Sequence, residues 1–142
     1  MRVIITRIGR ELIALDVASV TEVIDAPEVA ALPLSPRGLA GQIAYRGAFL
    51  PVLDPAVLLG VAREGGTGAV LVLAGAPAAL WVDDAEDVWA MEESEVRIVP
   101  SGSDTLGVLR GLLSRGTDVV AHVDAGALAA AALATLRQGS EP

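Results

Sequence analysis

The sequence predicts an all-β fold, a barrel or a sandwich, with one helix at its C-terminal end. Short apolar runs alternate with turn residues from residue 2 to residue 124, and several short strands at such spacing are typical of all-β barrels and sandwiches. Gly, Pro and Asp lie between the runs, for example at Gly65-Gly66 and Gly75-Ala76-Pro77, where they favour turns. The tail after residue 124 is rich in Ala and Leu instead, as expected of a helix.

Ten segments have the length and composition of ordinary strands. Pro51 falls inside the fifth and would remove one ladder donor, so we expect this strand to lie at a sheet edge or to carry a bulge. In chain order the segments are Val3–Ile8, Glu11–Leu15, Val20–Ile24, Gly41–Tyr45, Phe49–Leu53, Ala69–Leu73, Ala79–Val82, Val88–Met91, Gly107–Leu113 and Val119–Val123.

Three segments favour helices. Asp16–Ser19 is expected to form a brief helical turn with Asp16 as its N-cap. Asp54–Leu59 has a proline at its first helical position and a glycine after its end, which fits the preferences of helix termini. Asp124–Arg137 begins with a capping aspartate and carries an arginine in its last turn. We expect one domain over residues 1–137 and a frayed tail over 138–142.

The composition excludes several classes of function. The chain has 142 residues, no cysteine and a net charge of −8. Without cysteine there are no disulfides, thiolate metal sites or thiol nucleophiles, and the negative charge argues against nucleic acids and anionic membranes. No apolar run approaches the ~20 residues that span a bilayer, so we expect a soluble cytoplasmic domain. All ten basic residues are arginine, and asparagine is absent.

No motif for catalysis or for cofactor binding stands in the chain. Neither a nucleophile–base arrangement nor a phosphate-binding loop is present, so we expect no enzyme and no cofactor. His122, the only histidine, is expected at the rim of a strand. The carboxylates between Asp83 and Asp87 would suit Mg²⁺ or Ca²⁺, although such a run is more often a solvated turn between strands. A small β-barrel that binds a metal or another ligand through Asp83–Asp87 stays open as an alternative.

The segment from Gly41 to Asp54 carries the most specific pattern. It predicts a hairpin with a turn at Arg46-Gly47. Its pattern, Gly-x-x-x-x-Arg-Gly-x-x-x-Pro-Val-x-Asp, resembles the signature hairpin of the CheW-like adaptor family of bacterial chemotaxis. The family usually has Asn-Leu-Arg-Gly at the turn, whereas this chain has Ala44 in place of the asparagine.

Four further segments resemble elements of the same family in the same order, so that the resemblance covers about residues 2–136. They match a Val-x-Glu-Val/Ile element, a Val-Asp-x-Val-x-x-Val stretch, a late glycine-containing strand and the final strand before the helix. The given sequence holds no kinase or receiver domain beside these segments, so we expect the stand-alone form of the family. The segments are Val17–Ile24, Leu80–Val88, Leu109–Leu112 and Val119–Asp124.

The resemblance implies a fold and a function. The expected fold is two small five-stranded SH3-like β-barrels side by side with a C-terminal helix, and the partition of strands between the barrels stays open. The expected function is a non-enzymatic adaptor that couples chemoreceptors to a CheA-type histidine kinase and is recruited to receptor arrays. One surface would grip the regulatory region of the kinase, and a groove between the barrels would take the tip of the receptor's cytoplasmic hairpin. A family member that binds only one partner, as a spacer or competitor, is the alternative.

The resemblance also implies binding residues. Val20, Glu22 and Arg46 would face the receptor, and period-2 alternation would place Val20, Glu22 and Ile24 on one face of their strand. An ordinary structural role for Arg46, stacked on its neighbour or paired with a surface carboxylate, is the alternative. Further residues expected at the kinase or receptor interface are Gly41, Tyr45, Gly47 and Leu109.

Overall fold

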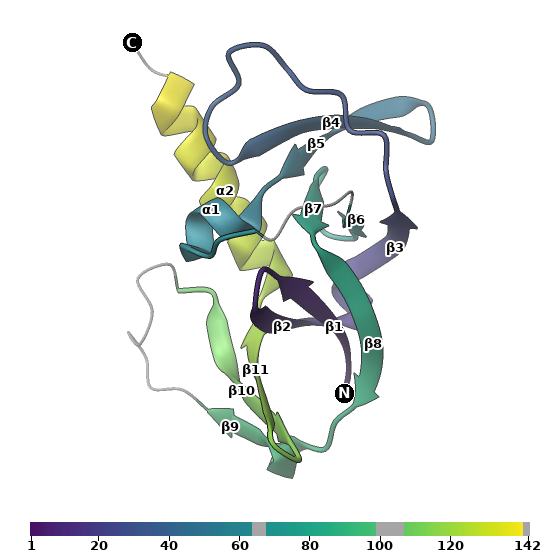
Figure 1. Cartoon of the computed structure of the whole chain (residues 1–142), viewed down its shortest axis with the longest axis vertical. Coiled ribbons are helices and arrows are strands. Elements are labelled where there is room, and N and C mark those ends of the chain that lie inside the picture. Colours follow the sequence, from purple (N-terminus) through teal and green to yellow (C-terminus); the bar gives the residue numbers. More distant parts are fainter. Residues whose placement is uncertain (64–67, 99–106, 141–142) are drawn as a thin grey trace.

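The computed structural model describes residues 1–63, 68–98 and 107–140, which form two β-sheets and a C-terminal helix (Figure 1). We call each sheet with its loops a lobe. The first lobe has the strand order β8 (Asp84–Ala90), β1 (Arg2–Ile8), β2 (Glu11–Asp16), β11 (Asp118–Val123), β10 (Leu109–Arg115) and β9 (Val96–Ile98). The second has the order β3 (Val20–Asp25), β6 (Ala69–Leu73), β7 (Ala79–Val82), β5 (Ala48–Leu53) and β4 (Leu39–Tyr45).

The predicted all-β class, the two-lobed arrangement and the C-terminal helix are confirmed, but the sheets are not closed barrels. Among the described residues, no pairing joins β8 to β9 in the first sheet or β3 to β4 in the second. The first sheet has six strands instead of five, because β9 adds to β10 through Gly111↔Ile98 and two further pairs. Edge strands are therefore present where barrel closure was expected to remove them.

The start of β8 and the surroundings of Pro51 differ from the sequence expectation for a physical reason. β8 begins at Asp84, not at Val88, because it pairs along β1 with Arg7 opposite Asp84 and Ile5 opposite Asp87. The acidic segment is thus mostly an edge strand instead of a turn. Pro51 lies on β5, which is an inner strand and has no register shift at the proline. The pairing with β7 starts only at Val52, so Pro51 stands where β5 has one neighbour.

Three apolar cores hold the lobes. Alternate residues of β1 and β6 face different cores, so both strands are buried on both faces, as near-continuous apolar runs predict. The interlobe core contains Ile4, Ile8, Ile13, Leu15, Leu53, Leu71, Leu73, Leu80, Val82, Leu128, Ala129 and Ala132, among others. The first-lobe core contains Val3, Ile5, Ala14, Trp89, Met91, Leu113 and Val120. The second-lobe core contains Ile43, Val52, Val70, Val72 and Ala79.

The chain crosses between the lobes at three places. β2 leads through the short 3₁₀ helix η1 (Val17–Ser19) into β3, β7 leads through Asp83 into β8, and β11 leads into α2 (Ala125–Ser140). The other helices are α1 (Pro55–Leu59), between β5 and β6, and η2 (Glu93–Glu95), before β9. Because the interlobe core takes side chains from both sheets and from α2, it packs the two lobes against each other.

The helix starts follow the sequence expectation in two of three cases. The Asp54 carboxylate accepts a hydrogen bond from the Ala56 backbone N–H at 3.0 Å, and Gly60 ends α1 in a left-handed conformation. The Asp124 carboxylate likewise accepts from the Ala127 N–H at 3.0 Å. Asp16 stands before η1, but its side chain makes no capping bond. α2 continues beyond Arg137 to Ser140, and residues 141–142 of the expected frayed tail lie outside the described residues.

Gly41 has a backbone that a side chain would not tolerate. Its φ is +152°, and a Cβ atom there would lie 2.3 Å from the carbonyl oxygen of Ala30. Ala30 forms a two-way bridge with Gln42, with N–O distances of 2.9 and 3.0 Å. The segment before β4 therefore runs directly over Gly41, which gives this glycine a folding role.

Asp124 makes stability depend on pH. The hydrogen bond from the Ala127 N–H is the main cause that holds the pKa of Asp124 below its ordinary value; burial opposes this, and the Arg110 guanidinium, 2.8 Å away, lowers it further. A depressed carboxyl pKa contributes stability above the unfolded-state pKa, and this is lost as pH falls through the folded-state pKa. We expect Asp124→Asn, which keeps a capping side chain, to be less stable than wild type at pH 7. The difference in urea unfolding free energy should shrink below about pH 4; a difference that is constant with pH would contradict this.

Gly41→Ala should be destabilising by more than about 2 kcal/mol, since it adds a backbone clash to a disfavoured φ. Gly75→Ala is the matched control, because a Cβ at Gly75 meets nothing within 4 Å and its φ is not in the left-handed range; it should change stability by less than about 0.5 kcal/mol. Urea unfolding measures both. Equal effects of the two substitutions would show that Gly41 is not a folding requirement.

Candidate partner-binding surface

The β4–β5 hairpin closes in a two-residue turn that begins with an arginine in a strained conformation. Tyr45 and Ala48 close the hairpin, and the two residues between them, Arg46 and Gly47, have φ values of +48° and +80°. Positive φ at both turn residues is the type I′ pattern, which suits the twist of a hairpin and favours Asn-Gly. For a non-glycine residue the left-handed region costs roughly 1–2 kcal/mol. The predicted turn is confirmed, and Arg46 is held there against its intrinsic preference.

The hairpin tip presents a cation and exposed apolar groups. Arg46 is exposed, and its guanidinium carbon lies 5.1 Å from the centre of the Tyr45 ring. Phe49 is 70% exposed, and it stands directly opposite the exposed Ala44 on the same face of the hairpin. The chain contains no other phenylalanine. The sequence analysis missed Phe49. An aromatic residue two positions after the turn was a usable signal, because it lies near the hairpin tip, where β5 pairs with β4 alone.

Tyr45 packs against the second-lobe core, yet its hydroxyl group is buried with no hydrogen-bond partner among the described residues. An unsatisfied buried hydroxyl is uncommon in native proteins and calls for an explanation. The half-buried Tyr45 ring lies against the Arg46 guanidinium and so connects the hairpin tip to the second-lobe core.

Val20 and Glu22 do not share a face of β3, contrary to the sequence expectation. A bulge lies between them, so that Val20 pairs with Leu73 and Glu22 pairs with Val72. Since directly opposite residues point to the same side of a sheet, Val20 lies on the side of the interlobe core, against which it packs. Glu22 is exposed and points the other way, together with Ile24. The extra residue of the bulge reverses the expected alternation.

Strand pairing does not bring the seven candidate residues together. Val20 and Glu22 lie on β3, one edge of the second sheet, whereas Gly41 and Tyr45 lie on β4, the other edge. Leu109 starts β10 in the first lobe and is half-buried. The interior between the lobes is filled by the interlobe core, so a groove for a partner would have to lie on the outer surface of this junction.

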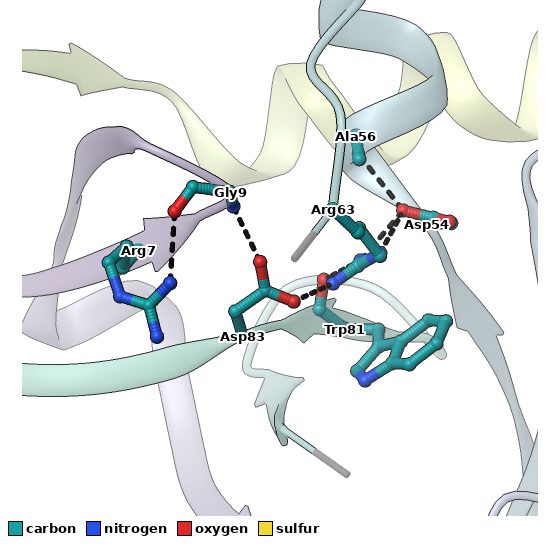
Figure 2. Close-up of polar contacts among 7 residues, drawn as sticks. All are labelled: Arg7, Gly9, Asp54, Ala56, Arg63, Trp81 and Asp83. Carbon is teal, nitrogen blue, oxygen red and sulfur yellow. Dashed lines mark hydrogen bonds and ion pairs between the residues drawn. The ribbon is translucent and has the colours of Figure 1, made fainter. Parts of the chain in front are cut away.

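The described side chains of the acidic segment are not arranged as a metal site. The described residues contain no group of three or more His, Asp or Glu side chains that could hold a metal ion. The Asp83 carboxylate pairs with Arg63 and accepts a hydrogen bond from the Gly9 backbone N–H (Figure 2). The Asp87 carboxylate accepts a hydrogen bond from the Val88 backbone N–H. Asp83 thus has a structural role that the sequence did not reveal.

His122 is buried, which corrects the expectation of a rim residue. Only 5% of its side chain is exposed, and its Nε2 lies 2.8 Å from the Asp16 carboxylate. Arg110 joins Asp16 to Asp124, at 3.4 and 2.8 Å. The Asp16 carboxylate therefore contacts Arg110 of β10 and His122 of β11, and it does not cap η1.

In the described part of the chain, no helix has both the length and the apolar character needed to cross a bilayer.

Comparison with known proteins found a match to a family model and to solved structures. A search among curated proteins found no match. Among solved structures, the chain is similar to the scaffolding protein TtCheW from Thermoanaerobacter tengcongensis, with a TM-score of 0.76 and 23% identity over 86% of this chain and 87% of that one. The family model for the CheW-like domain matches residues 2–132, nearly the whole chain. The protein belongs to the CheW-like domain family.

Proposed function

We propose that this protein is a non-enzymatic adaptor that couples a chemoreceptor to a CheA-type histidine kinase. Members of the family act as scaffolds in chemotaxis signalling, and the similar solved protein is itself called a scaffolding protein. The observation that carries the proposal is Arg46, exposed at the hairpin tip in a conformation that asparagine or glycine would adopt more easily. A strained residue that persists at a surface supports a role in binding.

The receptor side of the proposal rests on the hairpin tip and on Glu22. Arg46 would give orientation by charge, and Phe49 would supply the apolar anchor that protein interfaces concentrate in a few residues. On β3, a substitution of Glu22 tests receptor binding more directly than one of Val20, since a charge at Val20 would also disturb the interlobe core. Gly47, Tyr45 and Leu109 are proposed as neighbours in the kinase or receptor interface, and Gly41 contributes by holding β4.

A second candidate is a family member that binds one partner only. The exposed Ala44, where the family usually has asparagine, favours it, because the amide group that could hydrogen-bond a partner is missing. Ala44 and Phe49 instead make an apolar strip on this face of the hairpin.

Co-purification separates these candidates. The intact protein is mixed with a kinase regulatory fragment and with a receptor cytoplasmic hairpin fragment, singly and together. Adaptor function predicts a complex that contains all three. Binding of only one fragment would support the single-partner alternative, and binding of neither would contradict both.

Arg46→Asn should separate binding from stability. It places the preferred Asn-Gly pair in a type I′ turn, so the free energy of unfolding should stay unchanged or rise by up to about 1 kcal/mol. Receptor-fragment affinity should fall at least about tenfold, while kinase-fragment binding persists. Arg97→Asn, at an exposed arginine of the first lobe, is the control for lost charge. Full receptor affinity in Arg46→Asn would exclude Arg46 from the interface.

Phe49→Thr should weaken receptor-fragment binding by more than about tenfold, since it removes the exposed ring but keeps a good strand former. Stability should change by less than about 1 kcal/mol. Val119→Thr is the matched control, because Val119 is 60% exposed on a strand of the first lobe. Isothermal titration calorimetry on both variants is the measurement; equal effects, or loss only in Val119→Thr, would place the anchor elsewhere.

A further inference from the structure

Arg63 lies in a connecting segment, and all three nitrogens of its guanidinium donate hydrogen bonds. It follows α1 by four positions, and its side chain is only 14% exposed. Nε and Nη2 donate to the same Asp54 carboxylate oxygen at 3.0 and 2.7 Å, and Nη1 donates to Asp83 at 2.9 Å. Nη2 also donates to the Trp81 carbonyl, and the guanidinium lies 4.0 Å from the centre of the Trp81 ring.

Asp83 carries this contact set from the second lobe to the first (Figure 2). Arg63, Asp54 and Trp81 belong to the second lobe, whereas Asp83 is the residue through which β7 passes into β8. One Asp83 carboxylate oxygen binds Arg63, and the other accepts from the Gly9 N–H in the turn between β1 and β2. The Asp83 backbone N–H donates to the Arg7 carbonyl of β1 at 2.9 Å, and its side chain is only 4% exposed.

A second, independent observation locates the same contact between the lobes. Gly9 has a φ of +61°, and a Cβ atom there would lie on the Ala62 carbonyl oxygen. The turn of the first lobe is thus packed directly against the backbone of the residue before Arg63. Hydrogen bonding and backbone packing therefore meet at one point between the lobes, and both depend on the segment that carries Arg63.

The charges make this contact sensitive to loss of the arginine. Two poorly exposed carboxylates, Asp54 and Asp83, share one guanidinium. Removing the guanidinium would take one ion pair from each carboxylate in a site that water reaches poorly, and breaking an ion pair is most disruptive in such a site. Lysine would restore the charge but not the forked set of donors.

We propose that Arg63 is a positioning residue that fixes the orientation of the two lobes relative to each other. An adaptor that contacts one partner through the hairpin of the second lobe and another elsewhere needs this orientation to be constant; that consequence rests on the function proposed above. The orientation itself does not, and it can be measured without any partner.

The test is a distance measurement between spin labels on the two lobes. The chain contains no cysteine, so Gly75→Cys in the β6–β7 turn and Thr117→Cys in the β10–β11 turn give two defined labels at exposed sites. Pulsed electron spin resonance compares this background with the same background carrying Arg63→Leu, Arg63→Lys or Arg97→Leu. Arg97, exposed in the first lobe, is the control for loss of an arginine. Circular dichroism and thermal unfolding establish that each variant is folded.

We expect the distance distribution of Arg63→Leu to broaden or shift, Arg63→Lys to do so as well, and Arg97→Leu to overlay the parent. Unchanged distributions in both Arg63 variants would overturn the inference. If Arg63→Leu does not fold, Arg63→Lys gives the measurement; loss of all structure in both would make Arg63 a general folding residue and would also overturn it.

A second readout connects the lobe orientation with function. Arg63→Lys should retain binding of the receptor and kinase fragments within about twofold, but should lose the receptor-dependent change in kinase activity. Failure of the wild-type protein to bind either fragment would contradict the proposed function. The role of Arg63 in lobe orientation would then be tested by the spin-label distances alone. Normal coupling in a variant whose distances have changed would show that the orientation does not matter for signalling.

Discussion

The shared apolar core between the two sheets is the constraint on which the rest of the structure depends. β1 and β6 are buried on both faces, so each belongs at once to the core of its own lobe and to the interlobe core. α2 adds Leu128, Ala129 and Ala132 to the same interlobe core. The hairpin tip, the β3 edge and the Arg63 contacts are therefore positioned by a core to which both lobes contribute.

Much of the fold could be predicted from the sequence, because buried strands have a clear pattern. The bounds of β6 and β7 match the expected segments, since both are uninterrupted apolar runs between turn residues. β9 was missed because three residues with a central arginine carry little signal without the partner strand β10. The start of β8 was missed because its carboxylates suggest a turn, although pairing with β1 makes the segment a strand.

The candidate surface was predictable only where local geometry decides it. The Arg46-Gly47 turn could be predicted because Gly47 separates two apolar runs, and glycine suits the positive φ of a two-residue hairpin turn. The faces of β3 did not follow, since a single-residue bulge after Val20 reverses the alternation. The roles of His122 and Arg63 depend on burial and on contacts between distant segments, such as the pairing of Arg63 with Asp83, 20 positions away. No local pattern encodes these contacts.

Native-state hydrogen exchange tests most directly whether the two lobes form one unit. Slowly exchanging backbone N–H groups report the free energy of the opening that exposes them, up to that of global unfolding. The shared core predicts that the slowest groups of β1 and of β6 open with the same free energy, equal to the global value from urea unfolding. A clearly lower value for the slowest groups of one lobe would show that this lobe opens alone, and would contradict the account of an adaptor with a fixed geometry.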